Sequence, residues 1–260
     1  MKHRSLLKNR KTVIAALVLH EVRARVNERR MRGIWILLEP VCHLFLFTHL
    51  FAQNGGQTVV GIDFSIFVLA GLVPFLLFRN IVLRLMGSTC AKRASFANRQ
   101  INPLNILIAR TLVETFFAIV VYIILVLIFA GYGFDVSIKA PVEWLLIIIL
   151  GLLFSFGLGV VLASLTHANP GINVCVRTMF FPLCFISGVL VPAVYIPHTM
   201  LPILLLNPFL HLEELIRSTV FSDYEPVEGV SVEYVMVMAL VLLFISICVY
   251  RRRRQSHIKL

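Results

Sequence analysis

The residues with the clearest chemical potential recur at every third position late in the chain, as Pro208, His211, Glu214 and Arg217. This spacing predicts that they share one side of a short helix. His211 and Glu214 form a histidine–carboxylate pair at helical spacing, whereas a zinc site would need three or four ligands. We therefore favour an exposed or helix-capping polar cluster over a metal or catalytic site.

Sequence motifs that bind nucleotides or activate nucleophiles do not occur in the chain. It lacks GxxxxGKS/T, so it cannot hold nucleotide phosphates in a P-loop. It also lacks HExxH, GxSxG and GxGxxG. These absences argue against a membrane-embedded transferase or protease, and the sequence predicts no cofactor and no metal in this chain.

Several ionisable residues fall inside apolar segments. A charge at the bilayer centre costs about 2.5–3.5 kcal/mol on insertion scales, so such residues usually face the protein interior. Arg110 and Glu114 are four residues apart and can pair on one helix face. Arg84 is expected to snorkel to the membrane interface. Arg79 and Arg177 either snorkel as well or line a path for an anionic substrate.

Aromatic residues are numerous, and most are expected to pack in the interior or to contact lipid. A few adjoin Gly-rich or Pro-rich stretches that interrupt regular packing, and these could stack on sugar rings in a substrate path. The candidates are Phe154, Phe156, Phe180, Phe181 and Tyr195.

The elements that must position these residues are membrane helices, as the composition indicates. Of the 260 residues, 59% are hydrophobic and 14% are charged, and the mean hydropathy is +0.90. Soluble domains carry about 25% charged residues. A soluble enzyme, a disordered regulator and a secreted disulfide scaffold are therefore excluded, which leaves an all-α integral membrane protein. The net charge of +11 then indicates topology and anionic lipid rather than nucleic acid.

A membrane-spanning helix needs about 20 mostly apolar residues, and this rule predicts six spans within a single domain over residues 1–260. Basic residues gather at 1–33, 79–110 and 251–260, which places both termini in the cytoplasm. The predicted spans are residues 34–53, 64–86, 104–130, 142–165, 170–190 and 232–250.

Three further segments flank these spans. Residues 12–32 predict an amphipathic helix in the membrane interface, with basic and aromatic residues at the lipid headgroups. Residues 90–103 are either a short helix that docks into a partner or a solvated loop. Residues 191–217 are apolar but rich in proline, including Pro192, which predicts a re-entrant element before the last span. The residues expected at the lipid interface are Arg23, Arg25, Arg29, Arg30, Arg32 and Trp35.

The order of these features resembles a known family, the membrane subunits of type-II ABC polysaccharide exporters, and within it the group 2 capsular polysaccharide export (KpsM-type) family. The resemblance covers nearly the whole chain. The segments that carry it are Arg32-Gly33-x-Trp35-x-x-x-Glu39-Pro40, Phe78-Arg79-Asn80, Gly87-Ser88, Asn98-Arg99, Arg110-x-x-x-Glu114, Ile186-Ser187-Gly188 and the Pro208/His211/Glu214/Arg217 series.

The resemblance implies a transporter permease that is not itself an enzyme. Two copies would form a channel in the bacterial inner membrane and associate with two copies of an ATPase subunit, which would bind ATP and Mg²⁺. The cargo would be a lipid-linked, usually acidic polysaccharide, and a periplasmic adaptor and an outer-membrane channel would complete the route. Residues 191–217 would lie in the periplasm. Segment 90–103 would couple to the ATPase through Lys92, Arg93, Phe96 and Arg99.

We further hypothesise that Arg79, Arg99 and Arg177 attract the anionic cargo. Exporters of O-antigen or teichoic acid, and drug-exporting permeases of the same superfamily, share this plan and remain alternatives.

Overall fold

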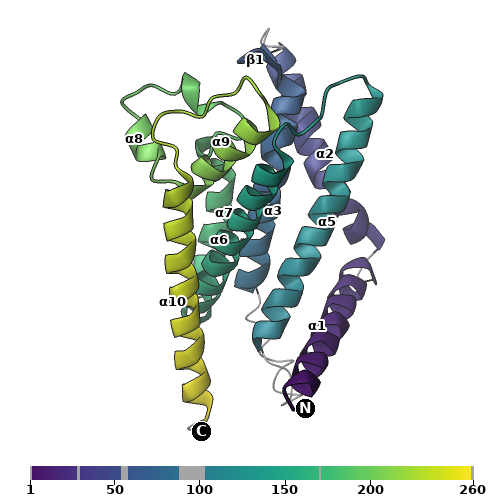
Figure 1. The fold of residues 1–260 in the computed structure, drawn as a ribbon, viewed down its shortest axis with the longest axis vertical. Coiled ribbons are helices and arrows are strands. Elements are labelled where there is room, and N and C mark those ends of the chain that lie inside the picture. Colours follow the sequence, from purple (N-terminus) through teal and green to yellow (C-terminus); the bar gives the residue numbers. More distant parts are fainter. Residues whose placement is uncertain (1, 28–29, 54–57, 88–102, 170, 259–260) are drawn as a thin grey trace.

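The computed structural model describes residues 2–27, 30–53, 58–87, 103–169 and 171–258. Long helices run side by side along the long axis, and both chain ends lie at the same end of the molecule (Figure 1). We call this the terminal end. The opposite end, where the strands β1 (Thr58–Val59) and β2 (Ile62–Asp63) lie, is the hairpin end.

The described residues are mostly helical, as the sequence predicts. Within them α3, α5, α6 and α10 are long and apolar enough to cross a membrane, and α7 is apolar but shorter. The predicted count of six spans stays a prediction. The helices are α1 (Lys2–Asn27), α2 (Arg30–Gln53), α3 (Phe64–Met86), α5 (Pro103–Gly131), α6 (Pro141–Ala168), α7 (Gly171–Ile186), α8 (Leu201–Leu204), α9 (Pro208–Val220) and α10 (Val232–Ile258), with a 3-10 turn η2 (Ala193–Tyr195).

Local sequence signals explain several helix ends. The β1–β2 turn has Val60 and Gly61 at φ of 53° and 77°, the left-handed conformation that a tight hairpin requires. Asp63 then caps α3, because its carboxylate accepts the Ser65 N–H at 2.8 Å. Helix α7 ends at Ile186, earlier than the predicted span 170–190, because Gly188 turns the backbone with φ of 75°.

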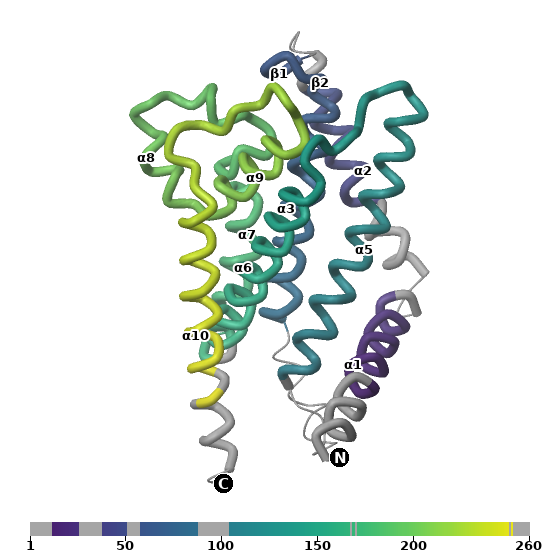
Figure 2. Tube along the Cα trace, in the orientation of Figure 1, coloured from purple at the N-terminus to yellow at the C-terminus, as the bar shows by residue number. Residues whose placement is uncertain are grey.

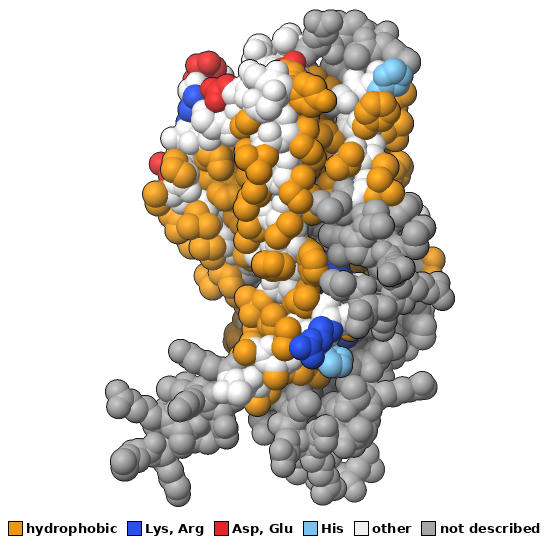
Figure 3. All heavy atoms as spheres, turned by 90° about the vertical axis from the view of Figure 1, so that its right-hand side faces the viewer, with side chains coloured by type: hydrophobic (Ala, Val, Ile, Leu, Met, Phe, Trp, Pro, Cys, Tyr) orange, Lys and Arg blue, Asp and Glu red, His pale blue; other side chains and the backbone are white. Residues whose placement is uncertain are grey.

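Helix α3 lies at the centre of the bundle and contacts α2, α5, α6 and α9 (Figure 2). In its most apolar stretch 83% of the residues are buried, compared with 22% in the corresponding stretch of α5 and 17% in that of α10. The outward faces of α5 and α10 are therefore apolar surfaces that suit contact with lipid. On the side of the molecule where α5 lies, Figure 3 shows hydrophobic side chains over much of the described surface, with charged side chains above and below them.

Glycines on α6 allow close contacts with the helices on both sides. A Cβ at Gly159 would lie 2.9 Å from Leu85 Cβ and 3.2 Å from Val82 Cα of α3. A Cβ at Gly157 would lie 3.0 Å from Leu242 Cβ of α10. Small residues have this role between membrane helices, where packing rather than hydrophobic expulsion drives association.

Ion pairs attach α1 to α5 and α3, and they differ from the predicted Arg110–Glu114 pair. Glu114 lies 2.6 Å from Arg25 of α1 and 2.9 Å from Arg84 of α3, whereas Arg110 lies 3.2 Å from Glu21 of α1. Two predictions are therefore corrected: Arg110 and Glu114 pair with other helices, and Arg84 has a buried carboxylate partner. A carboxylate inside an apolar bundle needs such partners from wherever the fold supplies them.

These contacts hold α1 against the part of α5 that is nearest the terminal end (Figure 1). The structure places residues 12–27 of the predicted interfacial segment in α1, and Arg30, Arg32 and Trp35 in α2. Arg29 lies outside the described residues. The position of α1 relative to a membrane stays a prediction.

We predict that Gly159→Ala destabilises the bundle by about 1–3 kcal/mol, because its new methyl group meets α3 backbone that cannot give way. Gly131→Ala is the matched control, since a Cβ there meets nothing within 4 Å. Thermal unfolding of the purified variants in detergent measures the difference. Equal melting temperatures for the two variants would contradict the close α3–α6 contact.

Candidate functional site

A groove between α2, α3 and α7 brings together four of the residues that the sequence singles out for a substrate path. It encloses about 500 Å³ of empty space, part of it open to the surroundings. Arg79 of α3 and Arg177 of α7 lie on its wall, as do Phe180 and Phe181 of α7. A groove with basic and aromatic walls can bind acidic groups and stack on sugar rings.

The two arginines of the groove have different surroundings. Arg79 forms an ion pair with Glu39 of α2, and its Nε donates to Asn80 Oδ1 at 3.2 Å. Arg177 is exposed, and its Nε donates to Asn173 Oδ1 at 2.7 Å. Among the described residues no carboxylate pairs with Arg177, so Arg79 is neutralised locally whereas Arg177 leaves a positive charge in the groove.

Aromatic rings continue the groove wall beyond the arginines. Phe181 and Phe185 of α7 have centroids 5.3 Å apart in an edge-to-face arrangement, and Phe185 lies 6.3 Å from Phe47 of α2. Phe181 and Phe185 are exposed. Exposed rings held in a fixed arrangement form an apolar surface that a large ligand or another protein copy could cover.

The structure separates the remaining path candidates from this groove. Phe154 is buried in the core, with its ring 5.3 Å from Phe209, and Phe156 is partly buried against the same core. Tyr195 lies in η2 at the hairpin end, where its hydroxyl accepts the Val60 N–H at 3.3 Å. The sequence could not separate these residues, because proximity to glycine or proline does not tell which face of a helix points inward.

The residue series that ends in Arg217 lies on α9, and its three polar members are buried rather than exposed. Asn207 caps the helix by accepting the Phe209 N–H at 3.1 Å, and Pro208 occupies the first turn. Of the two predicted alternatives, an exposed or a helix-capping polar cluster, the exposed one is therefore wrong. Helix α9 contacts α3, α6 and α10, which leaves none of its polar series facing outward.

The buried guanidinium of Arg217 contacts groups from two other segments of the chain. Its Nη1 donates to the Gly188 carbonyl at 2.6 Å, and its Nη2 donates to the Val189 carbonyl at 2.7 Å. The guanidinium carbon lies 3.8 Å from the centroid of the Phe67 ring in α3. Gly71 of α3 makes room for this group, since a Cβ there would lie 2.4 Å from Arg217 Nη2.

His211 and Glu214 each have separate structural partners. The Ser231 N–H donates to His211 Nδ1 at 3.0 Å, which requires the proton on Nε2, and Nε2 donates to the Leu205 carbonyl at 2.8 Å. Glu214 Oε1 accepts the Tyr224 hydroxyl at 2.8 Å. These contacts hold the loops on both sides of α9. Because His211 and Glu214 bond to other groups and not to each other, they do not form a catalytic pair.

Glu213 is a functional candidate that the sequence reading missed. It is fully buried, and neither of its carboxylate oxygens has a hydrogen-bond partner among the described residues. Burial raises the pKa of the Glu213 carboxyl well above its ordinary value, Arg217 lowers it, and Glu214 raises it further. Glu213 follows His211 by two positions and so falls off the three-residue series, which is why the spacing gave no signal.

Other predicted site residues fall outside the groove and α9. Lys92, Arg93, Phe96 and Arg99 lie outside the described residues. Pro192 is buried and precedes η2. Arg23 is exposed on α1, whereas Arg25 points to Glu114. Within the described residues, no group of three His, Cys, Asp or Glu side chains could hold a metal ion.

The chain is similar to membrane proteins of capsule export. The family described as ABC-2 type transporter matches residues 12–221. The polysialic acid transport protein KpsM of Escherichia coli is 35% identical over 257 residues, which is 97% of this chain and 98% of that protein. The capsule polysaccharide export inner-membrane protein CtrC of Neisseria meningitidis serogroup A is 25% identical over 93% of this chain and 91% of its own. BexB of Haemophilus influenzae, described in the same words, is 23% identical over 90% and 88%.

We predict that Glu213→Gln removes a pH dependence from the stability of the protein. Because the folded-state pKa of Glu213 is raised, its contribution is fully present below the ordinary value of 4.5 and is lost as pH rises toward the raised pKa. In that window the wild type should lose about 1.4 kcal/mol per pH unit relative to Glu213→Gln. Melting temperatures of both proteins across the window measure this, and parallel curves would exclude a raised pKa.

Proposed function

Because the chain belongs to the ABC-2 type transporter family, we propose that it is the transmembrane subunit of an ATP-driven exporter of lipid-linked capsular polysaccharide in the inner membrane. The observation that carries the proposal is the groove between α2, α3 and α7, where Arg79, Arg177, Phe180 and Phe181 converge. Full-length similarity to the capsule-export proteins supports this cargo class.

The groove suits a long acidic polymer. Arg177 supplies an attractive charge that no described carboxylate cancels, whereas Glu39 limits the charge of Arg79. One uncompensated arginine attracts an acidic sugar without holding it tightly, and a cargo that must slide needs weak contacts repeated along a path. Exposed rings such as Phe181 offer stacking surfaces for successive sugars.

A second copy of the chain would close the groove into a channel. The groove opens to the surroundings, and large apolar side chains that line it are exposed, among them Phe181 at 65% and Phe185 at 43%. An isologous dimer would join two such faces around a central axis. The hairpin end, with α8 and α9, would then face the periplasm at the channel exit.

The energy would come from a separate ATPase subunit, since the sequence holds no P-loop. Residues 90–103 would contact that subunit from the cytoplasm. Closure of the two ATPase copies on ATP would then move the spans as rigid bodies, the usual form of such transitions. A periplasmic adaptor and an outer-membrane channel would carry the polymer onward.

We predict that Arg177→Glu lowers the export of an acidic capsule at least tenfold, because it replaces attraction by repulsion inside the groove. Lys139→Glu is the matched control, since Lys139 is an exposed cation in the α5–α6 loop at the hairpin end. Surface polysaccharide is measured on cells that contain equal amounts of each variant in the membrane. Normal export with Arg177→Glu would remove this residue from the path.

We also predict that Phe96→Asp releases the ATPase subunit, because it places a charge in the proposed docking segment. Tyr132→Asp, at a residue 80% exposed in the turn after α5, is the control. Gentle affinity purification from membranes, followed by mass spectrometry and an ATPase assay, gives the result. A stoichiometric P-loop ATPase with the wild type and the control, and its loss with Phe96→Asp, is expected. Intact wild-type protein without such a partner would overturn the transporter assignment.

A further inference from the structure

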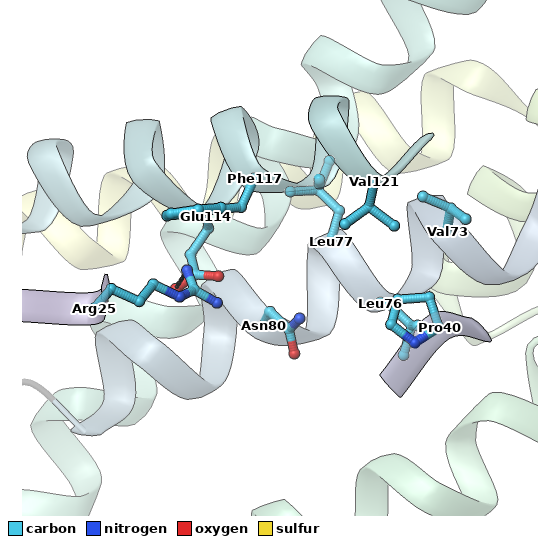
Figure 4. Close-up of a pocket in the computed structure, with 10 residues that line it drawn as sticks. Arg25, Pro40, Val73, Leu76, Leu77, Asn80, Glu114, Phe117 and Val121 are labelled. Atoms are coloured by element: carbon cyan, nitrogen blue, oxygen red, sulfur yellow. Dashed lines mark ion pairs between the residues drawn. The ribbon is translucent and has the colours of Figure 1, made fainter. Parts of the chain in front are cut away.

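A second pocket lies where α1, α2, α3 and α5 meet, and it adjoins the groove at Leu76, which lines both. It is a shallow hollow of about 330 Å³ of empty space, part of it open to the surroundings. Its polar members are Arg25, Asn80 and Glu114, and the rest of its wall is apolar (Figure 4). The apolar members are Pro40, Val73, Leu76, Leu77, Phe117, Ala118 and Val121.

The polar and apolar members are separated along the helix axes. In Figure 4, Arg25 and Glu114 point toward one another at one side, and Leu76, Val121 and Pro40 lie at the other. Because α3 runs from the hairpin toward the terminal end and α5 runs back, the polar side of the pocket is nearer the terminal end. A lipid in the leaflet on that side has the same order, with its headgroup near the membrane surface and its acyl chain toward the middle.

The charges at the polar side favour an anionic headgroup. Glu114 pairs with Arg25 and Arg84, and Glu21 pairs with Arg110. These three arginines and two glutamates leave one net positive charge beside the pocket. A basic residue near the membrane surface attracts anionic lipid by about 1 kcal/mol, so one net positive charge favours an anionic over a neutral headgroup.

Asn80 adds a hydrogen-bond donor at the same place. Its Oδ1 accepts from Arg79, at 3.2 Å from Nε and 3.0 Å from Nη2, which leaves the amide N–H groups pointing away from Arg79. Within the described part of the chain these N–H groups have no acceptor. A phosphate oxygen would satisfy them.

From this arrangement we infer that the pocket between α1, α2, α3 and α5 binds one anionic phospholipid, with its phosphate at Arg25 and Asn80 and one acyl chain along Val73, Leu77 and Ala118. The lipid would fill the space between α1 and the bundle and so help to hold α1 in place. This inference is independent of the proposed export function, because it requires only that the chain lies in a membrane.

The test measures which lipid each protein retains. Purified protein is exchanged into micelles that contain phosphatidylglycerol and phosphatidylcholine with identical chains, and native mass spectrometry counts the bound lipids. The wild type should keep one phosphatidylglycerol per chain.

Ala118→Trp fills the pocket and should abolish retention, whereas Ala130→Trp, at an exposed site on the same helix, should not. Arg25→Gln should lower the preference for phosphatidylglycerol about fivefold, and Arg23→Gln should leave it unchanged.

Photocrosslinking of the wild type gives a second readout that does not depend on whether a variant folds. A phosphatidylglycerol with a photoreactive acyl chain should label residues 73–77 of α3 and 117–121 of α5. Labels confined to other segments, equal retention by Ala118→Trp and Ala130→Trp, or equal binding of both lipids by the wild type would overturn the inference. A lipid-linked glycan found at these residues in place of phospholipid would overturn the choice of occupant.

Discussion

The buried guanidinium of Arg217 is the contact on which the hairpin half of the molecule depends. It links α9 to the two carbonyls that follow α7 and to the Phe67 ring and Gly71 of α3. Glu214 of the same helix is its counter-ion, with Oε1 3.8 Å from Arg217 Nη1. A buried charge that loses its partners costs several kcal/mol, so these contacts must stay in place for the charge to be tolerated. Because they come from three segments distant in sequence, α9, the residues after α7 and the first turns of α3 form one rigid unit.

The rest of the bundle is attached to that unit by two kinds of contact. Helix α6 meets α3 and α10 through glycines, and such backbone-close packing leaves little room for sliding. Helices α1 and α2 pack against α5 and α3, with Leu44 of α2 in the core, and ion pairs such as Glu39–Arg79 and Arg25–Glu114 add to this packing.

The sequence predicted the helical class and the bounds of α3 well, because an apolar run between an Asp cap and Gly87 is a local signal. It also selected Arg79 and Arg177, since arginine in an apolar segment is conspicuous wherever it folds. It did not give their surroundings. Glu39 lies forty positions before Arg79, and no local pattern joins them. Phe154 lies in the core and not in the groove, because proximity to a glycine does not tell which face of a helix points inward.

The position of α3 has a consequence for how the protein is made. This helix leaves the ribosome early, yet the arginine that occupies the notch at Gly71 belongs to α9, near the end of the chain. The core therefore cannot be completed during synthesis of the first helices, and its defining contacts are among the most non-local in the fold. A chain stopped before α9 would hold α3 in the bilayer with an empty notch and an unpartnered Phe67. Cellular quality control could recognise such an incomplete bundle before a permease is assembled.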